Sequence, residues 1–154
     1  MSLETRPASA HLVSPEPMIG ALLRVPFEAV NLHVNAALQG AGFTDISPAH
    51  QRVFQVLPPE GIRLTALAER AQVTKQSMGA LVDHLEMGGY LERVMDPTDR
   101  RASFIRRTER GWRVEQTARA SIQQLEMEWG RRLGAAKLRL LHELLRELVA
   151  IVES

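Results

Sequence analysis

Apolar residues recur at helical spacing near both ends of the chain and predict long helices there. A wide apolar stripe runs from Met18 to Leu38, and Pro26 inside it predicts one helix that is bent. A second helical pattern starts at Thr108 and is expected to end at Gly134. The last segment carries apolar residues over so much of its circumference that it predicts a partner surface. The central stripe of that segment comprises Leu138, Leu141, Leu145, Leu148 and Val152.

The middle of the chain predicts two short helices joined by a three-residue turn. Thr65 is expected to cap the first helix, 66–71, and Thr74 is expected to cap the second, 75–87. The apolar side chains of the second helix face one way, so its other face is offered outward. This outward face carries Lys75, Gln76, Gly79, Ala80 and Asp83. The arrangement fits a helix-turn-helix, whose second helix enters the major groove of DNA.

Two short strands, 90–94 and 102–106, are predicted around a turn-rich and charged loop. The whole chain has a formal net charge of only +1, but seven arginines oppose three acidic residues from Arg93 to Arg113. A basic hairpin directly after a helix-turn-helix is typical of a winged helix, because arginines on a narrow loop suit the negative minor groove.

Composition limits the classes of protein to consider. A chain of 154 residues predicts one domain, in which 1–16 forms a flexible arm. The sequence contains no cysteine, which excludes disulfides, thiolate catalysis and thiol-based redox sensing. It also lacks a run of about 18 apolar residues and a secretory signal, so we expect a cytoplasmic protein with no membrane partner.

The predicted winged helix indicates a protein that binds double-stranded DNA. Gln76 and Ser77 can form hydrogen bonds with base edges or phosphates, and the small residues Gly79 and Ala80 allow close approach of the duplex. The alternative is a dimer on the same fold that binds a protein or carries a small ligand and does not contact DNA. The salt dependence of DNA affinity separates the two, because a DNA-binding protein releases counterions.

Four segments of the chain resemble the multiple antibiotic resistance regulator (MarR) family. They are Leu67-Ala68-Glu69-Arg70, Val82-Asp83-His84-Leu85-Glu86, Gly89-Tyr90-Leu91-Glu92-Arg93 and Asp96-Pro97-Thr98-Asp99-Arg100-Arg101. The last of these is the wing motif and is the most specific. The resemblance implies a mainly α fold with a small β-hairpin wing, in which 47–111 forms the winged helix-turn-helix and 17–46 and 112–154 form dimerisation helices.

The resemblance also implies a role for individual residues. It places Lys75, Gln76, Ser77, Gly79 and Ala80 at the major groove. In the wing, Arg101 would enter the minor groove, Asp99 would orient it by a salt bridge, and Arg100 would contact a phosphate. Arg107, where the family commonly has Leu, is a candidate for one more contact with the DNA backbone. The residues expected at the dimer interface are Leu22, Leu138, Leu141, Leu145, Leu148 and Val152.

As a member of this family, the protein would be a homodimer that binds a pseudo-palindromic operator, most often as a repressor. A small organic effector, often aromatic or anionic, would bind between the dimerisation helices and the winged helix-turn-helix and weaken DNA binding. The sequence shows no signature of catalysis or of a cofactor. Its five histidines lack the spacing of a metal site, and Trp112 and Trp129 are expected to pack in the core.

Overall fold

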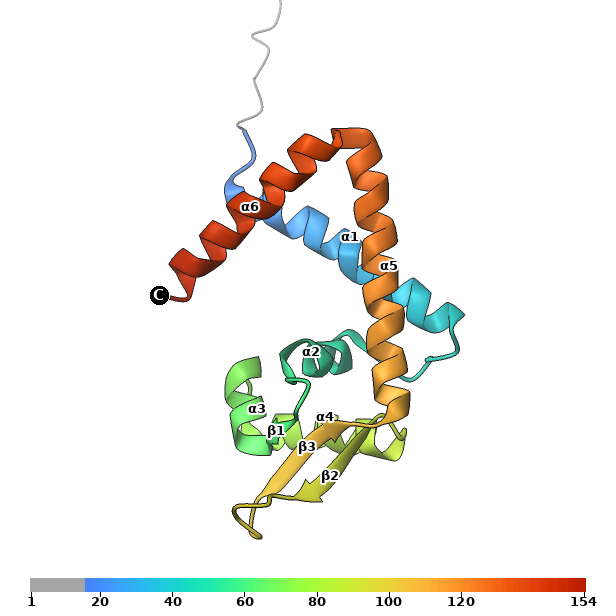
Figure 1. Ribbon diagram of the computed structural model, residues 1–154, viewed down its shortest axis with the longest axis vertical. Coiled ribbons are helices and arrows are strands. Elements are labelled where there is room, and N and C mark those ends of the chain that lie inside the picture. Colours follow the sequence, from blue (N-terminus) through green and yellow to red (C-terminus); the bar gives the residue numbers. More distant parts are fainter. Residues whose placement is uncertain (1–15) are drawn as a thin grey trace, which may run out of the picture.

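The computed structural model describes residues 16–154, so the predicted flexible arm, apart from Glu16, lies outside the described residues. Within the described part the chain forms a mainly helical fold with a small antiparallel sheet, as the sequence predicts (Figure 1). The elements in order are α1 (Ile19–Gly40), α2 (Pro48–Val56), β1 (Ile62–Arg63), α3 (Leu64–Ala71), α4 (Lys75–Met87), β2 (Leu91–Met95), β3 (Ser103–Arg107), α5 (Glu109–Leu133) and α6 (Ala135–Val152).

Helix α5 joins two parts of the molecule. The lower part in Figure 1 contains α2, α3, α4 and the sheet, and the upper part contains α6 and the first turns of α1, which crosses α5. The chain turns sharply between α5 and α6 at Gly134, whose φ of 93° is readily available only to glycine. Because α5 starts directly after the wing strand β3, it connects the wing to the upper helices without a flexible linker.

The hydrophobic core lies in the lower part and where α1 meets α5. Its fully buried side chains are Leu38, Ile46, Val53, Leu67, Met78, Val82, Leu85, Tyr90, Leu91, Ile105 and Val114. By contrast, α6 has no buried residue, and the first half of α1 is exposed in the single chain. The stripes that predict a partner surface are therefore not covered by the described part of the chain itself.

Three antiparallel strands form the sheet in the order β1-β3-β2. The two longer strands confirm the predicted hairpin, with each strand shifted by one residue toward the C-terminus. The predicted cap at Thr65 is wrong, because α3 already begins at Leu64. Arg63 pairs with Phe104 in the sheet, so the chain passes directly from strand to helix without a side-chain cap. Helix α1 runs through Pro26 as one helix, as predicted.

Candidate nucleic-acid interface

Helix α4 presents the outward face that the sequence predicts. Its cap is confirmed, because the Thr74 hydroxyl accepts a hydrogen bond from the Ser77 backbone N–H at 3.1 Å. Met78, Val82 and Leu85 are fully buried, whereas Lys75, Gln76, Ser77 and Ala80 are exposed and Gly79 is partly exposed. A Cβ atom at Gly79 would meet nothing within 4 Å, so this face is open to a large partner.

The turn between α3 and α4 keeps a tight geometry although it contains no glycine. Gln72 has a φ of 56° and is the residue other than glycine with positive φ in the described part of the chain. Its backbone N–H donates to the Glu69 carbonyl, and the Val73 N–H donates to the Ala68 carbonyl, which closes the end of α3. Gln72 therefore adopts the left-handed conformation that ends α3 although it is not a glycine.

A buried carboxylate holds the base of the wing. Asp96 accepts hydrogen bonds from the backbone N–H of Thr98 at 2.8 Å and from its hydroxyl at 2.7 Å, and it forms an ion pair with Arg63 of β1. The hydrogen bonds from Thr98 have the largest effect and that from Arg63 the next largest, and together they lower the pKa of Asp96 to about 2. The carboxylate therefore stays charged. The sequence does not reveal Arg63 as a wing residue, because it lies 33 positions before Asp96.

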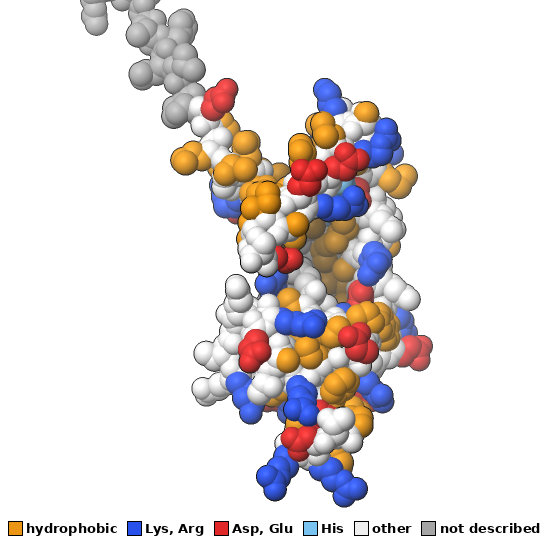
Figure 2. Space-filling model, turned by 60° about the vertical axis from the view of Figure 1, so that its left-hand side comes forward, with side chains coloured by type: hydrophobic (Ala, Val, Ile, Leu, Met, Phe, Trp, Pro, Cys, Tyr) orange, Lys and Arg blue, Asp and Glu red, His pale blue; other side chains and the backbone are white. Residues whose placement is uncertain are grey.

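The basic residues at the tip of the wing, Arg100 and Arg101, are exposed to solvent. The side chain of Asp99 accepts a hydrogen bond from the backbone N–H of Arg101 at 3.0 Å, so it stabilises the backbone conformation of the loop at that arginine. The side-chain salt bridge that the resemblance implies between these two residues is not among the ion pairs of residues 16–154. Figure 2 shows Lys and Arg side chains at the lower end of the molecule, where Figure 1 places the β2–β3 loop.

The arginines between 93 and 113 do not all remain free. Four of them form ion pairs with carboxylates, and a fifth, Arg110, donates a hydrogen bond to the Tyr90 hydroxyl at 3.1 Å. Within the described residues, only Arg100 and Arg101 of this group have a side chain without such a partner. Within this group of arginines, the basic charge that is available to a ligand therefore lies at the tip of the wing.

The prediction that Arg107 contacts DNA is wrong. Arg107 is 7% exposed and points inward from the end of β3, where its guanidinium donates hydrogen bonds to the carbonyls of Phe54, Leu57 and Pro58. Its Nε lies 2.6 Å from Oε2 of Glu115 on α5. The residue therefore ties the end of the wing to α2 and α5. Sequence alone gave no sign of this, because the three carbonyls lie about 50 residues away.

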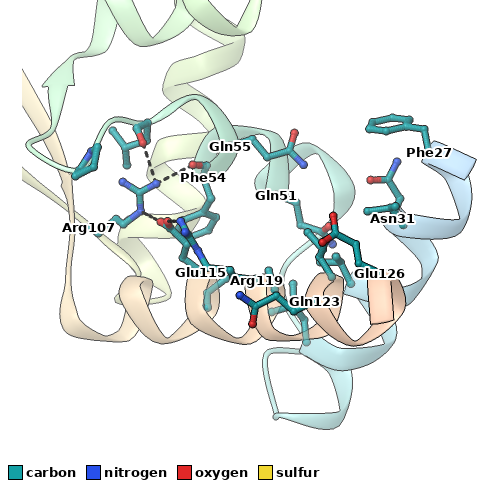
Figure 3. A pocket seen from close by; sticks show the side chains of 18 residues that line it. Phe27, Asn31, Gln51, Phe54, Gln55, Arg107, Glu115, Arg119, Gln123 and Glu126 are labelled. Atoms are coloured by element: carbon teal, nitrogen blue, oxygen red, sulfur yellow. Dashed lines mark hydrogen bonds and ion pairs between the residues drawn. The ribbon is translucent and has the colours of Figure 1, made fainter. Parts of the chain in front are cut away.

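A cavity of about 610 Å³ lies between α1, α2 and α5, where the upper helices meet the winged helix-turn-helix. Pockets that hold drug-sized molecules have about this volume. Figure 3 shows Arg107 at one end, with its contacts to Phe54 and Glu115, and Phe27 and Asn31 of α1 at the other. Most of the lining residues come from three helices distant in sequence, so no local sequence pattern indicates which residues line the cavity. Neither Trp112 nor Trp129 lines this cavity, and both are partly buried elsewhere.

Two histidines stack where α2 meets α4. The rings of His50 and His84 lie 4.1 Å apart and nearly parallel, and Nε2 of His84 lies 2.7 Å from the backbone oxygen of Asp45. Burial, and then the nearby His84, lower the pKa of His50, while the Asp45 carboxylate acts in the opposite direction. Because the folded state binds a proton less readily than the unfolded state, this contact loses stability as the pH falls below the usual histidine range.

We expect the free energy of unfolding to fall less between about pH 7 and about pH 5 in His50→Gln than in the unaltered protein. Glutamine keeps the capping box that His50 forms with Ser47, so the helix start is preserved while the titrating group is removed. Urea denaturation at a series of pH values measures the difference. Equal pH dependence in the two proteins would show that His50 does not titrate in this range.

The described residues contain no group of three or more histidine, cysteine, aspartate or glutamate side chains placed to hold a metal ion. His11 lies outside the described residues. No helix within 16–154 is both long and apolar enough to cross a membrane.

Known proteins match this chain in its winged helix and in its fold. The sequence profile of the MarR family matches residues 44–102, from the loop before α2 to the wing. No curated protein matches the chain by sequence. Among solved structures, the transcriptional regulator Tm0710 from Thermotoga maritima is 28% identical, with 87% of this chain and 93% of that chain covered and a TM-score of 0.65.

Two further solved structures share the fold at lower identity. Wild-type MarR from E. coli in its apo form is 23% identical, with 86% of this chain and 97% of that chain covered and a TM-score of 0.69. The repressor CouR, bound to a 23-mer DNA duplex, is 21% identical, with 86% and 92% covered and a TM-score of 0.67. The chain therefore has the winged helix-turn-helix of the MarR family, on the fold of MarR-type transcriptional regulators.

Proposed function

We propose that this chain is a transcriptional regulator that binds double-stranded DNA as a homodimer in the cytoplasm and has no catalytic role. The observation that carries the proposal is the position of Arg100 and Arg101. Among the arginines from 93 to 113 in the described chain, these two have neither an ion pair nor a side-chain hydrogen bond, and they extend from the tip of the wing that follows α4. The DNA-bound repressor CouR, which has the same fold, supports this assignment.

The contacts with DNA follow from the exposed residues. In the proposed complex, α4 enters the major groove with Lys75, Gln76, Ser77, Gly79 and Ala80. Arg101 enters the minor groove and Arg100 contacts a phosphate. Asp99 supports the backbone of Arg101 through its 3.0 Å hydrogen bond. The base of the wing is held by Asp96, so the tip is presented in a defined direction.

The homodimer is proposed from the uncovered apolar side chains of α1 and α6. Monomeric proteins rarely expose a large continuous apolar surface. Leu22 is 56% exposed, and Leu141, Leu145 and Val152 on α6 are 41%, 37% and 77% exposed. Leu138 and Leu148 of the same stripe are partly buried. A second copy that packs its α1 and α6 on these helices would bury both stripes and hold two wings for a pseudo-palindromic operator.

We further propose that the protein is a repressor that releases DNA when a small organic effector binds in the cavity. Arg107 lies in the wall of the cavity and ties β3 to α2 and α5. An occupant that moves α5 against α2 would therefore also move the wing. If the occupied state no longer matches half-sites one helical turn apart, about 34–36 Å, the effector lowers DNA affinity by linkage.

Selection of binding sites from random duplex DNA at about 0.15 M salt tests the DNA-binding role, because non-specific binding is already weakened there. We expect enrichment of an inverted repeat whose half-sites are one helical turn apart. The logarithm of affinity should then fall steeply with the logarithm of salt concentration. No enriched site and no salt dependence, with the dimer intact, would favour the dimeric module that does not bind DNA.

Arg101→Ala is expected to weaken operator binding by roughly 1–3 kcal/mol per site, because it removes the contact in the minor groove. The dimer should stay intact, since the residue lies at the exposed tip of the wing, away from α1 and α6. Gel-shift titration measures the affinity, and sedimentation measures the dimer. Arg139→Ala on α6 removes an exposed arginine away from the wing and serves as the control. Unchanged affinity in the Arg101 variant would remove the wing tip from the mechanism.

A further inference from the structure

The cavity between α1, α2 and α5 is lined by as many acidic as basic side chains. Arg107 and Arg119 are its basic residues, and Glu115 and Glu126 are its acidic residues, so its formal charge is zero. The formal charge of the cavity lining therefore gives an anion no advantage over an uncharged ligand. What the cavity binds depends on which of its polar groups still lack partners.

The guanidinium of Arg107 has no free edge for a carboxylate. Nη2 donates to the carbonyls of Phe54 and Leu57 at 2.7 and 2.8 Å, and Nη1 donates to that of Pro58 at 3.1 Å. The remaining side, Nε, lies 2.6 Å from Glu115 Oε2. An anionic ligand would have to displace Glu115 or bind beside its negative charge.

The second arginine and second glutamate of the cavity lie nearer to solvent. The Arg119 side chain is 71% exposed and already pairs with Glu115 at 3.1 Å. The Glu126 side chain is 38% exposed and lies 3.4 Å from Nε2 of His142. Ion pairs in such exposed positions contribute little, because water screens them. Neither residue therefore provides a strong site for a charged group.

Three buried polar atoms of the cavity lining have no hydrogen bond within the described residues: Nε2 of Gln51, Nε of Arg107 and Oε2 of Glu115. The last two form an ion pair with each other, so Gln51 alone of these three residues has neither a hydrogen bond nor an ion pair at that atom. The residue is 8% exposed, and its Nε2 has no hydrogen-bond acceptor among the described residues. It lines the cavity from α2, and the apolar side chains of Phe27, Phe54 and Ile122 line the same cavity. A buried donor without an acceptor is unfavourable, so a ligand that supplies an oxygen at this point gains affinity.

We infer that the cavity binds an uncharged, largely apolar molecule whose carbonyl or hydroxyl oxygen accepts a hydrogen bond from the Gln51 amide. The inference rests on the proposed function and makes it more specific. The family resemblance implies an effector that is often aromatic or anionic, whereas the paired charges of this cavity select against the anionic members. Ring systems fit the apolar walls, and the oxygen of an amide, ester, ketone or alcohol fits the buried Gln51 donor.

Matched pairs of ligands that differ only in charge test this inference. The full-length protein, without DNA, is titrated with aromatic primary amides and their parent carboxylates, from benzamide and benzoate to naphthamide and naphthoate. Calorimetry or ligand-detected NMR at neutral pH measures binding. We expect each amide to bind at least about tenfold more tightly than its carboxylate, because a buried carboxylate without a partner is strongly disfavoured.

Gln51→Leu is expected to weaken binding of the amides by about fivefold to tenfold, the effect of one hydrogen bond to a buried neutral donor. Leucine has a similar volume and no polar atom, and a thermal melt confirms that the variant is folded. Gln51→Asn, which keeps an amide but shortens the side chain, provides a second test if the leucine variant is unfolded. Gln124→Leu, exposed on α5 and outside the cavity lining, should bind like the unaltered protein.

Three results would overturn the inference. One is tighter binding of the carboxylates, which would show that the pair between Arg107 and Glu115 opens for an anion. Another is unchanged amide affinity in both Gln51 variants. The third is no binding by any pair at millimolar concentration. None of these results depends on DNA, whereas failure of the proposed function would be seen in the site selection described above.

Discussion

Arg107→Met is expected to lower the free energy of unfolding by about 3–5 kcal/mol, the effect of removing one partner from a buried ion pair. The variant would leave the Glu115 carboxylate without its buried cation, which lies 2.6 Å away in the unaltered protein. It would also leave the carbonyls of Phe54, Leu57 and Pro58 without the donors that now satisfy them. Urea denaturation at one fixed protein concentration measures the change, since the stability of a dimer depends on concentration.

The neighbouring arginine supplies a matched control. Arg106 lies on the same strand but is exposed, and its ion pair with Glu92 is on the surface. Arg106→Met should therefore change stability by less than about 1 kcal/mol. Adding Glu115→Gln to Arg107→Met should restore part of the lost stability, because it removes the unpaired buried charge. If the Arg106 and Arg107 variants are equally stable, Arg107 does not hold the wing to α2 and α5.

A chain that ends before Leu138 is expected to be monomeric at micromolar concentration, because the deletion removes the apolar stripe of α6. No residue of α6 is buried in the single chain, so its loss should leave the core of the winged helix-turn-helix intact. Analytical sedimentation measures the oligomeric state, and circular dichroism measures the remaining helix. DNA affinity should fall with the dimer, since each half-site would then be bound separately.

Point variants separate the loss of the dimer from the loss of a helix. Leu141→Glu together with Leu145→Glu places two charges in the apolar stripe and should also produce monomers. Arg139→Glu together with Arg146→Glu introduces the same residue type on the opposite face of α6 and should leave the dimer intact. A stable dimer of the shortened chain would show that α6 is not the dimerisation element.

Local signals predicted the elements well where neighbouring residues determine them. Thr74 caps α4, Thr108 caps α5, and Gly134 ends α5, because a cap depends on backbone groups within about four positions. The same reasoning failed at Thr65. There the pairing of Arg63 with Phe104, a residue distant in sequence, determines where the strand ends and where α3 begins.

The candidate site was predictable to different degrees in its different parts. The exposed face of α4 and the motif at the wing tip are each contiguous in sequence, so both could be predicted and both are outward in the structure. Arg107 was placed wrongly at the DNA because its sequence neighbours are basic and outward. Its burial depends on carbonyls at the end of α2, and nothing near Arg107 in the sequence signals them.

Local sequence patterns were enough to predict the two short helices with their turn, the hairpin with its basic tip, and the long apolar helices at both ends. These features depend on interactions between residues close together in the chain. Three other features follow from the packing of the folded chain: which arginines stay free, the ion pair of Arg63 with Asp96, and the unpaired Gln51 amide in the cavity. Each of these depends on segments that are far apart in sequence and meet only when the core packs.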